Sequence, residues 1–237
     1  MKIGVTLPQF RHEARSAIEA ARRAEGLGLD GVFCFDHLWP MGRPDRPALS
    51  SAPLLGAVAA STSTVTVGTL VARVGLVPDG VLTAVLSGLA TISGDRMIAG
   101  IGTGDHLSRP ENLAYGIPFE PADDRRARLM DVAAAVHRRG IPVWVGGGHP
   151  KTVALAGRLG VPVNLWGGDP GRIAGLTAAG TEVTWGGPVG RTESGAASDL
   201  AELSAAGATW AVCAWPESLE ALARAADLVR RGQDRSR

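Results

Sequence analysis

The stretch LGLDGVFCF at residues 27–35 ends an alanine-rich segment and begins an apolar one, with Gly28 near the junction. The same form returns in RLGVPVNLW at 158–166 and in AAGATWAVC at 205–213. In each case a glycine follows a segment with helical spacing, as is common at helix C-termini, and an apolar strand comes next. This recurring unit predicts parallel strands joined by helices.

Eight such units can be followed along the chain. Strands are expected near residues 2–7, 31–35, 65–71, 97–101, 142–145, 161–166, 182–185 and 210–214. Helices are expected near 16–27, 52–60, 81–92, 123–138, 151–158, 171–178, 197–206 and 218–231. The strands are apolar throughout, which is typical of a parallel sheet covered on both faces. Eight units favour an α/β fold of the (β/α)8 TIM barrel type, and an open doubly wound sheet is the alternative.

The length of 237 residues suits one barrel, and no linker or change in composition divides the chain. We therefore expect a single compact domain over residues 1–232. The basic end at 233–237 is expected to be a flexible tail, because chain termini are usually poorly ordered. The fourth expected helix is joined to the fifth strand only by the residues HRRG at 137–140, the first two of which overlap the end of that helix, so this connection is short.

Composition excludes several functions. The 24 Lys and Arg residues nearly balance the 23 Asp and Glu residues. The basic residues form no stripe with interleaved aromatic residues, so a nucleic-acid partner is not expected. No apolar run approaches the roughly 20 residues that cross a bilayer, and no export signal is found. Cys34 and Cys213 lie in apolar runs, so buried thiols and a cytoplasmic location are expected. The histidines lack the spacing of metal ligands, so no metal is expected.

Active sites of barrels lie at the C-terminal ends of the strands, and long loops there often carry function. The longest expected loops follow the second and fourth strands, at 36–50 and near 103–121. The motif FDHLWP places Asp36 and His37 at this rim, where a histidine can relay a proton at neutral pH. The alternative is a histidine that only caps the loop. Trp39 could line a ligand site or anchor the loop.

Glycine-rich turns follow three more strands. In GIGTGDHL at 100–107, Gly102 and Gly104 would let the backbone approach a ligand, and Asp105 belongs either to a site or to a loop cap. The third glycine of a dinucleotide fingerprint is missing. The turns VGGGHP at 145–150 and WGGDP at 166–170 open helices. Such turns present N–H groups to anions, although tight-turn glycines are an equal alternative.

Taken together, these motifs resemble the bacterial luciferase-like monooxygenase superfamily, including its deazaflavin (coenzyme F420) branch. The likeness covers nearly the whole chain. It is carried by KIGVTLPQF at 2–10, LGLDGVFCFDHLWP at 27–40, GTLVARVGLVP at 68–78, GIGTGD at 100–105, YGIPFEPADDRRARLMD at 115–131 and IPVWVGGGHPKTVALAGRLG at 141–160. Each motif alone is weak, whereas their order and spacing together are fairly specific.

The resemblance implies hydride transfer between coenzyme F420 and a small organic substrate across the C-terminal face of the barrel. His37 matches an acid/base histidine, and Asp105 matches an acidic residue that is often glutamate; these are the expected catalytic residues. Leu70 and Val71 match a bulge, often with a cis peptide bond, beneath the ring. Trp39 is the expected substrate contact. The cofactor-binding residues implied are Asp36, Leu70, Val71, Ala72, Thr103, Gly104, Gly146, Gly147, Gly148, Gly167 and Gly168.

Two features depart from the family pattern. Its members usually carry a long insertion where this chain has only HRRG, and Asp105 is shorter than a glutamate. Three alternatives therefore stay open: an FMN-dependent monooxygenase that uses oxygen, a flavin-binding protein without catalysis, and an unrelated barrel such as a sugar-phosphate isomerase. A homodimer is open as well, because relatives commonly dimerise.

Overall fold

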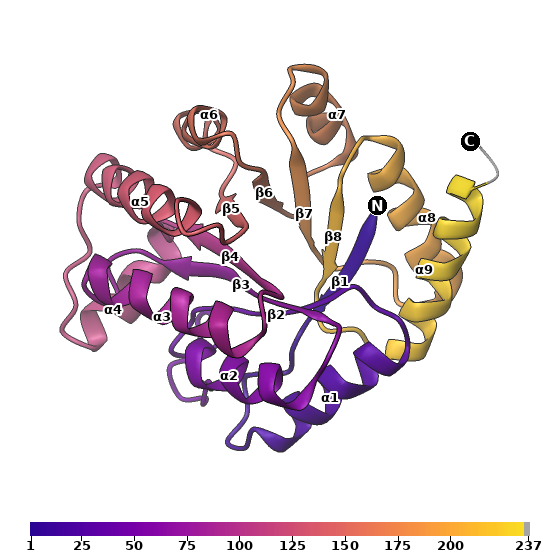
Figure 1. Ribbon diagram of the computed structural model, residues 1–237, viewed down its shortest axis with the longest axis horizontal. Coiled ribbons are helices and arrows are strands. Elements are labelled where there is room, and N and C mark those ends of the chain that lie inside the picture. Colours follow the sequence, from indigo (N-terminus) through magenta and orange to yellow (C-terminus); the bar gives the residue numbers. More distant parts are fainter. Residues whose placement is uncertain (235–237) are drawn as a thin grey trace.

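Eight parallel strands close into a barrel in the computed structural model, which describes residues 1–234 (Figure 1). The barrel closes where β1 pairs with β8, with Lys2 opposite Trp210. The predicted TIM barrel is therefore confirmed. The strands are β1 (Lys2–Thr6), β2 (Gly31–Cys34), β3 (Thr66–Arg73), β4 (Met97–Gly102), β5 (Val143–Gly146), β6 (Val163–Trp166), β7 (Val183–Gly187) and β8 (Trp210–Cys213).

Helices surround the strands, and α9 lies beside α1 and α8 (Figure 1). Eight of them match the expected helices to within a few residues. The short helices η1 (His106–Ser108) and α4 (Arg109–Ala114) were not predicted. The others are α1 (Arg15–Gly26), α2 (Ser51–Ser61), α3 (Asp79–Ile92), α5 (Ala122–His137), α6 (Pro150–Leu159), α7 (Pro170–Ala178), α8 (Glu193–Ala205) and α9 (Leu219–Asp234).

The C-terminal helix is longer than expected. The expected range was 218–231, whereas the helix continues through Gly232 to Asp234. The first two residues of the expected tail at 233–237 are therefore helical, and the rest lie outside the described residues. Within residues 1–234, no helix combines the length and apolar character needed to span a membrane.

Aromatic side chains fill the lower barrel interior. The ring of Phe33 stacks on Trp144 with centroids 5.3 Å apart. Phe33 also meets Trp210 in a T-shaped arrangement, with centroids 5.9 Å apart. Inward-facing glycines make room for these rings, because a Cβ at Gly31 would lie 2.9 Å from Trp210 and one at Gly68 would lie 2.5 Å from Phe33. We call Phe33, Trp144 and Trp210 the aromatic plug. It closes the barrel below the C-terminal rim.

Both cysteines are fully buried and unpaired, as predicted. They face the layer between strands and helices, where they pack in the main hydrophobic cluster. Burial raises the pKa of the Cys213 thiol to about 12. Burial also raises the pKa of the Cys34 thiol well above its ordinary value. Both thiols are therefore protonated at neutral pH.

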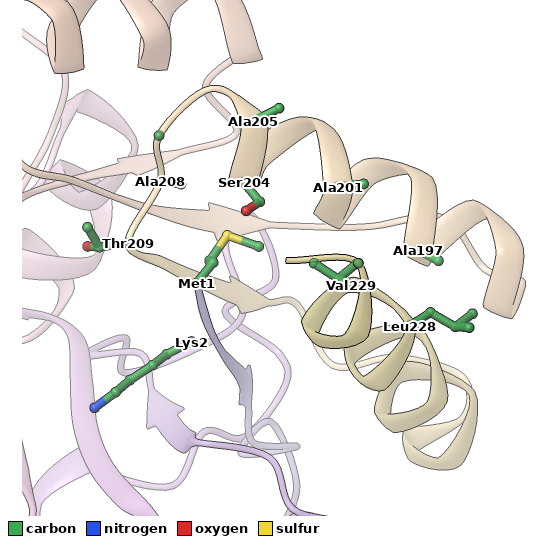
Figure 2. A pocket seen from close by; sticks show the side chains of 12 residues that line it. Met1, Lys2, Ala197, Ala201, Ser204, Ala205, Ala208, Thr209, Leu228 and Val229 are labelled. Atoms are coloured by element: carbon green, nitrogen blue, oxygen red, sulfur yellow. The ribbon is translucent and has the colours of Figure 1, made fainter. Parts of the chain in front are cut away.

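A hollow of about 910 Å³ lies between α8 and α9, near the start of β1 (Figure 2). Small and aliphatic side chains form most of its wall, among them Ala197, Ala201 and Leu228. It is at the end of the barrel opposite to the C-terminal ends of the strands. In TIM barrels that end contributes to stability and not to catalysis.

Candidate active site

A second cavity, of about 410 Å³, opens at the C-terminal ends of the strands above the aromatic plug. Ten of the predicted site residues line it: Asp36, His37, Leu70, Val71, Thr103, Gly104, Asp105, Gly146, Gly147 and Gly148. They come from four strand ends, β2 to β5, that are distant in sequence. Lining residues that were not predicted are Phe10, Phe35, Met41, Arg73, Ser108, Asn164 and Trp166.

The floor of the cavity is formed by an irregular part of β3. The peptide bond between Leu70 and Val71 is cis, as the resemblance implied, and the pairing of β3 with β4 shifts register here. The Val71 side chain fills the space over two neighbouring strands. A Cβ would lie 2.4 Å from Val71 at Gly102 and 2.7 Å from it at Gly146. Glycine at these two positions is therefore what accommodates Val71.

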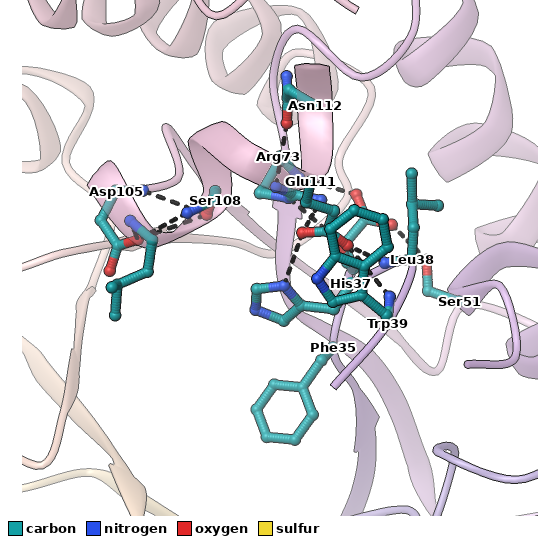
Figure 3. A network of polar contacts seen from close by, with 12 residues as sticks. Phe35, His37, Leu38, Trp39, Ser51, Arg73, Asp105, Ser108, Glu111 and Asn112 are labelled. Atoms are coloured by element: carbon teal, nitrogen blue, oxygen red, sulfur yellow. Dashed lines mark hydrogen bonds and ion pairs between the residues drawn. The ribbon is translucent and has the colours of Figure 1, made fainter. Parts of the chain in front are cut away.

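His37 is held by a buried glutamate that sequence reasoning missed (Figure 3). Its Nδ1 lies 3.0 Å from Oε2 of Glu111, which is on the short helix α4 and is 2% exposed. The other carboxylate oxygen of Glu111 accepts hydrogen bonds from the backbone N–H groups of Leu38 and Trp39. One carboxylate thus fixes both the imidazole ring and the loop that carries it.

Charge around this pair determines which nitrogen of His37 carries the proton. Burial favours the neutral form of Glu111, but the hydrogen bond from His37 and the charge of Arg73 outweigh it and hold its pKa below the ordinary value. Nη2 of Arg73 lies 2.8 Å from Glu111. The ionised carboxylate accepts the Nδ1–H of His37, so in the neutral ring Nε2 keeps its lone pair. Nε2 has no hydrogen-bond partner within residues 1–234.

Asp36 ties the β2 loop to β3. Its Oδ1 accepts the hydroxyl of Ser51 at 2.9 Å, and its Oδ2 accepts the backbone N–H of Arg73 at 2.9 Å. The side chain of Arg73 in turn donates to the backbone oxygen of Asp36 at 3.0 Å. Both carboxylate oxygens thus have protein partners, which makes Asp36 an anchor of the loop. Its contact with a cofactor stays a prediction.

Asp105 caps the short helix η1. Its carboxylate accepts the N–H groups of Leu107 at 2.9 Å and Ser108 at 3.2 Å. The preceding turn is held from α5, where Arg125 donates to the backbone oxygens of Thr103 at 2.6 Å and Gly104 at 2.7 Å. The loop-cap alternative therefore describes the contacts of Asp105, although the residue also lines the cavity. A catalytic role for it stays a prediction.

The structure places four predicted site residues outside the cavity lining. Trp39 packs on Tyr115, with ring centroids 5.6 Å apart, which corresponds to the loop-anchor alternative. Ala72 faces the helix layer, because the β3 bulge changes the direction of the side chains. Gly167 and Gly168 lie farther out on the rim, where the oxygen of Gly168 accepts the indole N–H of Trp185.

Aromatic rings form one wall of the cavity. Phe35 meets Trp166 edge to face with centroids 5.2 Å apart, and Trp166 is 51% exposed. Phe35 is positioned by the fully buried Gln9, whose side chain accepts the N–H of Phe35 at 2.6 Å and donates to its oxygen at 2.9 Å. This wall suits a flat, apolar ligand surface.

Signals for the missed residues are present in the sequence but weak. Asp105 and Ser108 have the spacing of a helix cap, and Pro110 suits a first helical turn, so they could have revealed η1 and α4. Arg73 and Asn164 stand out only as polar residues in apolar strands. No sequence rule indicates that Glu111 folds back onto His37.

The chain matches one family model, described as luciferase-like monooxygenase, over residues 1–139. A protein from Nakamurella multipartita named F420-dependent glucose-6-phosphate dehydrogenase is 32% identical over 133 residues, which cover 54% of this chain and 36% of that protein. A protein of the same name from Beutenbergia cavernae is 30% identical over 147 residues, covering 62% and 42%. The chain spans less than half the length of these two relatives.

Solved structures share the fold. An F420-dependent secondary alcohol dehydrogenase, in complex with an F420–acetone adduct, superposes with a TM-score of 0.80 at 13% identity, covering 97% of this chain and 99% of that one. The coenzyme F420-dependent tetrahydromethanopterin reductase from Methanopyrus kandleri gives 0.74 at 14% identity, covering 94% and 96%. The family model matches more than half of the residues of this chain, so the chain belongs to the luciferase-like monooxygenase family.

Proposed function

We propose that this protein is an F420-dependent oxidoreductase that transfers a hydride between the deazaflavin and a small organic substrate with a hydroxyl or carbonyl group. The observation that carries this proposal is His37, held through Nδ1 by the ionised Glu111 at the edge of a ring-sized cavity. The names of the curated relatives support the choice of cofactor. The F420-dependent structural neighbours agree with it at the level of the fold.

The cavity residues fit a planar heteroaromatic ring. Leu70 and Val71 provide an apolar floor, and Phe35 and Trp166 provide an aromatic wall. The side chain of Asn164 is buried at the floor, and its Oδ1 has no hydrogen-bond partner in the described part of the chain. A ring with an N–H or O–H group at its edge would satisfy this oxygen.

The rim between β5 and α6 is suited to the anionic tail of such a cofactor. Gly147 has a φ of +120°, which turns the backbone sharply before α6. Arg172 brings positive charge beside this turn and donates to the backbone oxygen of Gly148. We infer that residues 146–148 hold the tail.

When bound, the deazaflavin supplies a ring that accepts or donates a hydride. Nε2 of His37 accepts the hydroxyl proton when the substrate is oxidised and returns it when the reaction runs in reverse. Glu111 stabilises the imidazolium that forms and keeps the ring oriented. Phe35 and Trp166 exclude water from one side of the reacting groups.

An anaerobic assay tests this proposal. Wild-type protein with F420 is offered secondary alcohols and sugar phosphates, and the visible absorbance of the cofactor reports its reduction. Replacing His37 by asparagine keeps the size of the side chain and removes the base, so turnover should fall by at least about 100-fold. Cofactor binding should be retained. His137→Asn, an exposed position on α5, serves as the matched control.

Two outcomes would contradict the proposal. If His37→Asn turned over at the wild-type rate, His37 would not be the acid/base residue. Oxygen consumption with reduced FMN, without any F420 turnover, would favour a monooxygenase.

A further inference from the structure

A polar pair lies inside the barrel at the level of the cavity floor. Asn164 on β6 is 3% exposed and lines the cavity, and Thr184 on β7 is fully buried beside it. Side chains alternate along a strand, so Val163 and Leu165 face the helices while Asn164 points into the barrel. Neither the aromatic plug nor the His37 network uses this amide.

The hydrogen bonds of Thr184 fix the orientation of the amide. The Thr184 hydroxyl lies 3.5 Å from the backbone oxygen of Val163, to which it can only donate. Its lone pair is then free to accept an N–H, which Nδ2 of Asn164 supplies at 3.0 Å. The amide nitrogen is therefore directed at β7. The carbonyl oxygen Oδ1 is left without a partner among residues 1–234.

An acceptor in this position is available to a ligand donor. No side chain within residues 1–234 donates a hydrogen bond to this oxygen. Oδ1 is not fully enclosed by protein atoms, so it faces the cavity, where a ligand group or water can donate to it. Because Asn164 lines the cavity, the donor can come from a molecule bound there.

We propose that Asn164 is a specificity-determining residue whose Oδ1 accepts a hydrogen bond from the ring of the bound cofactor. This inference rests on the proposed function. Two ring groups have the required chemistry: the imide N–H, which F420 and FMN share, and the ring hydroxyl of the deazaflavin, which FMN lacks. If the hydroxyl is the donor, Asn164 distinguishes F420 from FMN.

Binding titrations separate these possibilities. Cofactor fluorescence is followed as wild-type protein and Asn164→Leu are added to F420 and to FMN. Leucine has a similar size and no polar atoms, so we expect F420 to bind Asn164→Leu roughly 10- to 100-fold more weakly. A loss for both cofactors identifies the imide N–H, and a loss for F420 alone identifies the hydroxyl. Unchanged F420 affinity overturns the inference.

A second variant keeps the test decisive if Asn164→Leu fails to fold. Thr184→Val retains the shape of the side chain and removes the group that orients the amide, so F420 should bind roughly 3- to 10-fold more weakly. Thr209→Val, the same change just before β8, is the matched control and should bind as the wild type does. Unchanged affinity in Thr184→Val would then overturn the inference. Wild-type protein that binds neither cofactor would overturn the proposed function as well.

Discussion

Glu111 fixes the orientation of the His37 ring. The position of His37 at the rim of the barrel would not fix that orientation by itself. The carboxylate is almost fully buried, yet it remains ionised beside Arg73 and accepts bonds from His37 and two backbone N–H groups. A buried charge with this many partners is costly to disturb. We therefore expect Glu111 to affect proton transfer by positioning His37, without contacting the substrate.

Replacing Glu111 by glutamine tests this role. Glutamine keeps an acceptor oxygen but removes the charge that stabilises the imidazolium, so turnover should fall by about 100-fold. The dissociation constant for F420 should change little, and Glu111→Asp should retain part of the activity. Glu202→Gln on the outer helix α8 is the control. An equal loss of cofactor binding and turnover would indicate a merely structural role.

At the residue scale, part of the site could be predicted. His37 and Asp36 follow from the rule that barrel sites lie after the strands, and the motif order singled out Leu70 and Val71. The partners of His37 could not be predicted, because Glu111 is 74 residues away and only the path of α4 brings the two together. Asn164 was missed because the sequence alone does not show which groups surround a polar residue in a strand, so its role could not be inferred.

The bulge in β3 and the glycines beside it act together at the scale of elements. Gly102→Ala should destabilise the protein by about 1–3 kcal/mol, because its Cβ would overlap Val71. Gly88 lies on the exposed face of α3 with open space around it, so Gly88→Ala should stabilise the protein by about 0.5–1 kcal/mol. Thermal or chemical unfolding measures both. If both substitutions changed the free energy of unfolding by the same amount, the side chain of Val71 would not be in tight contact with position 102.

Glu25 connects α1 to the start of β3. Its Oε1 accepts the backbone N–H groups of Ser63 at 2.8 Å, Thr64 at 2.6 Å and Val65 at 3.0 Å. Burial opposes ionisation of Glu25, but these hydrogen bonds outweigh it and lower its pKa to about 2. The folded state therefore holds the proton less tightly than the unfolded state does.

This lowered pKa has a defined effect on stability. The contribution of Glu25 is fully present above the ordinary value near 4.5 and is lost as the pH falls toward 2. At pH 7, Glu25→Gln should be less stable by about 1 kcal/mol, since the amide oxygen still accepts but carries no charge. Urea unfolding at several pH values should show the difference narrowing below pH 4.5. A constant difference would contradict this account.

Elements with strong periodicity were predicted well. The strands and the eight long helices were placed to within a few residues, because each shows a clear apolar pattern and several end in glycine. The helix α4 was missed because six residues are too few to show a period. It is nevertheless the element that carries Glu111.

Barrel closure is a property of the whole molecule. The eightfold repeat of strand and helix predicted it, whereas the pairing of β1 with β8 joins residues that are about 200 positions apart and that no local pattern connects. The aromatic plug was not predicted either. Its rings and the glycines that accommodate them come from different strands and meet only after closure.

Cysteine reactivity reports on the intact barrel. Cys34 and Cys213 are fully buried on β2 and β8, and burial raises the pKa of both thiols. A thiol reagent such as DTNB at pH 8 should therefore react with neither thiol in the native state and with both after unfolding in guanidinium. Rapid labelling of the native protein would show that the barrel opens more readily than its packing implies.

If the cavity at the C-terminal ends of the strands binds a deazaflavin, the wild-type protein must bind F420 in solution. Equilibrium titration of the wild-type protein with F420, followed by cofactor fluorescence, tests it most directly. We predict saturable quenching with one cofactor bound per chain. Fluorescence that stays unchanged up to a large excess of protein would contradict this binding.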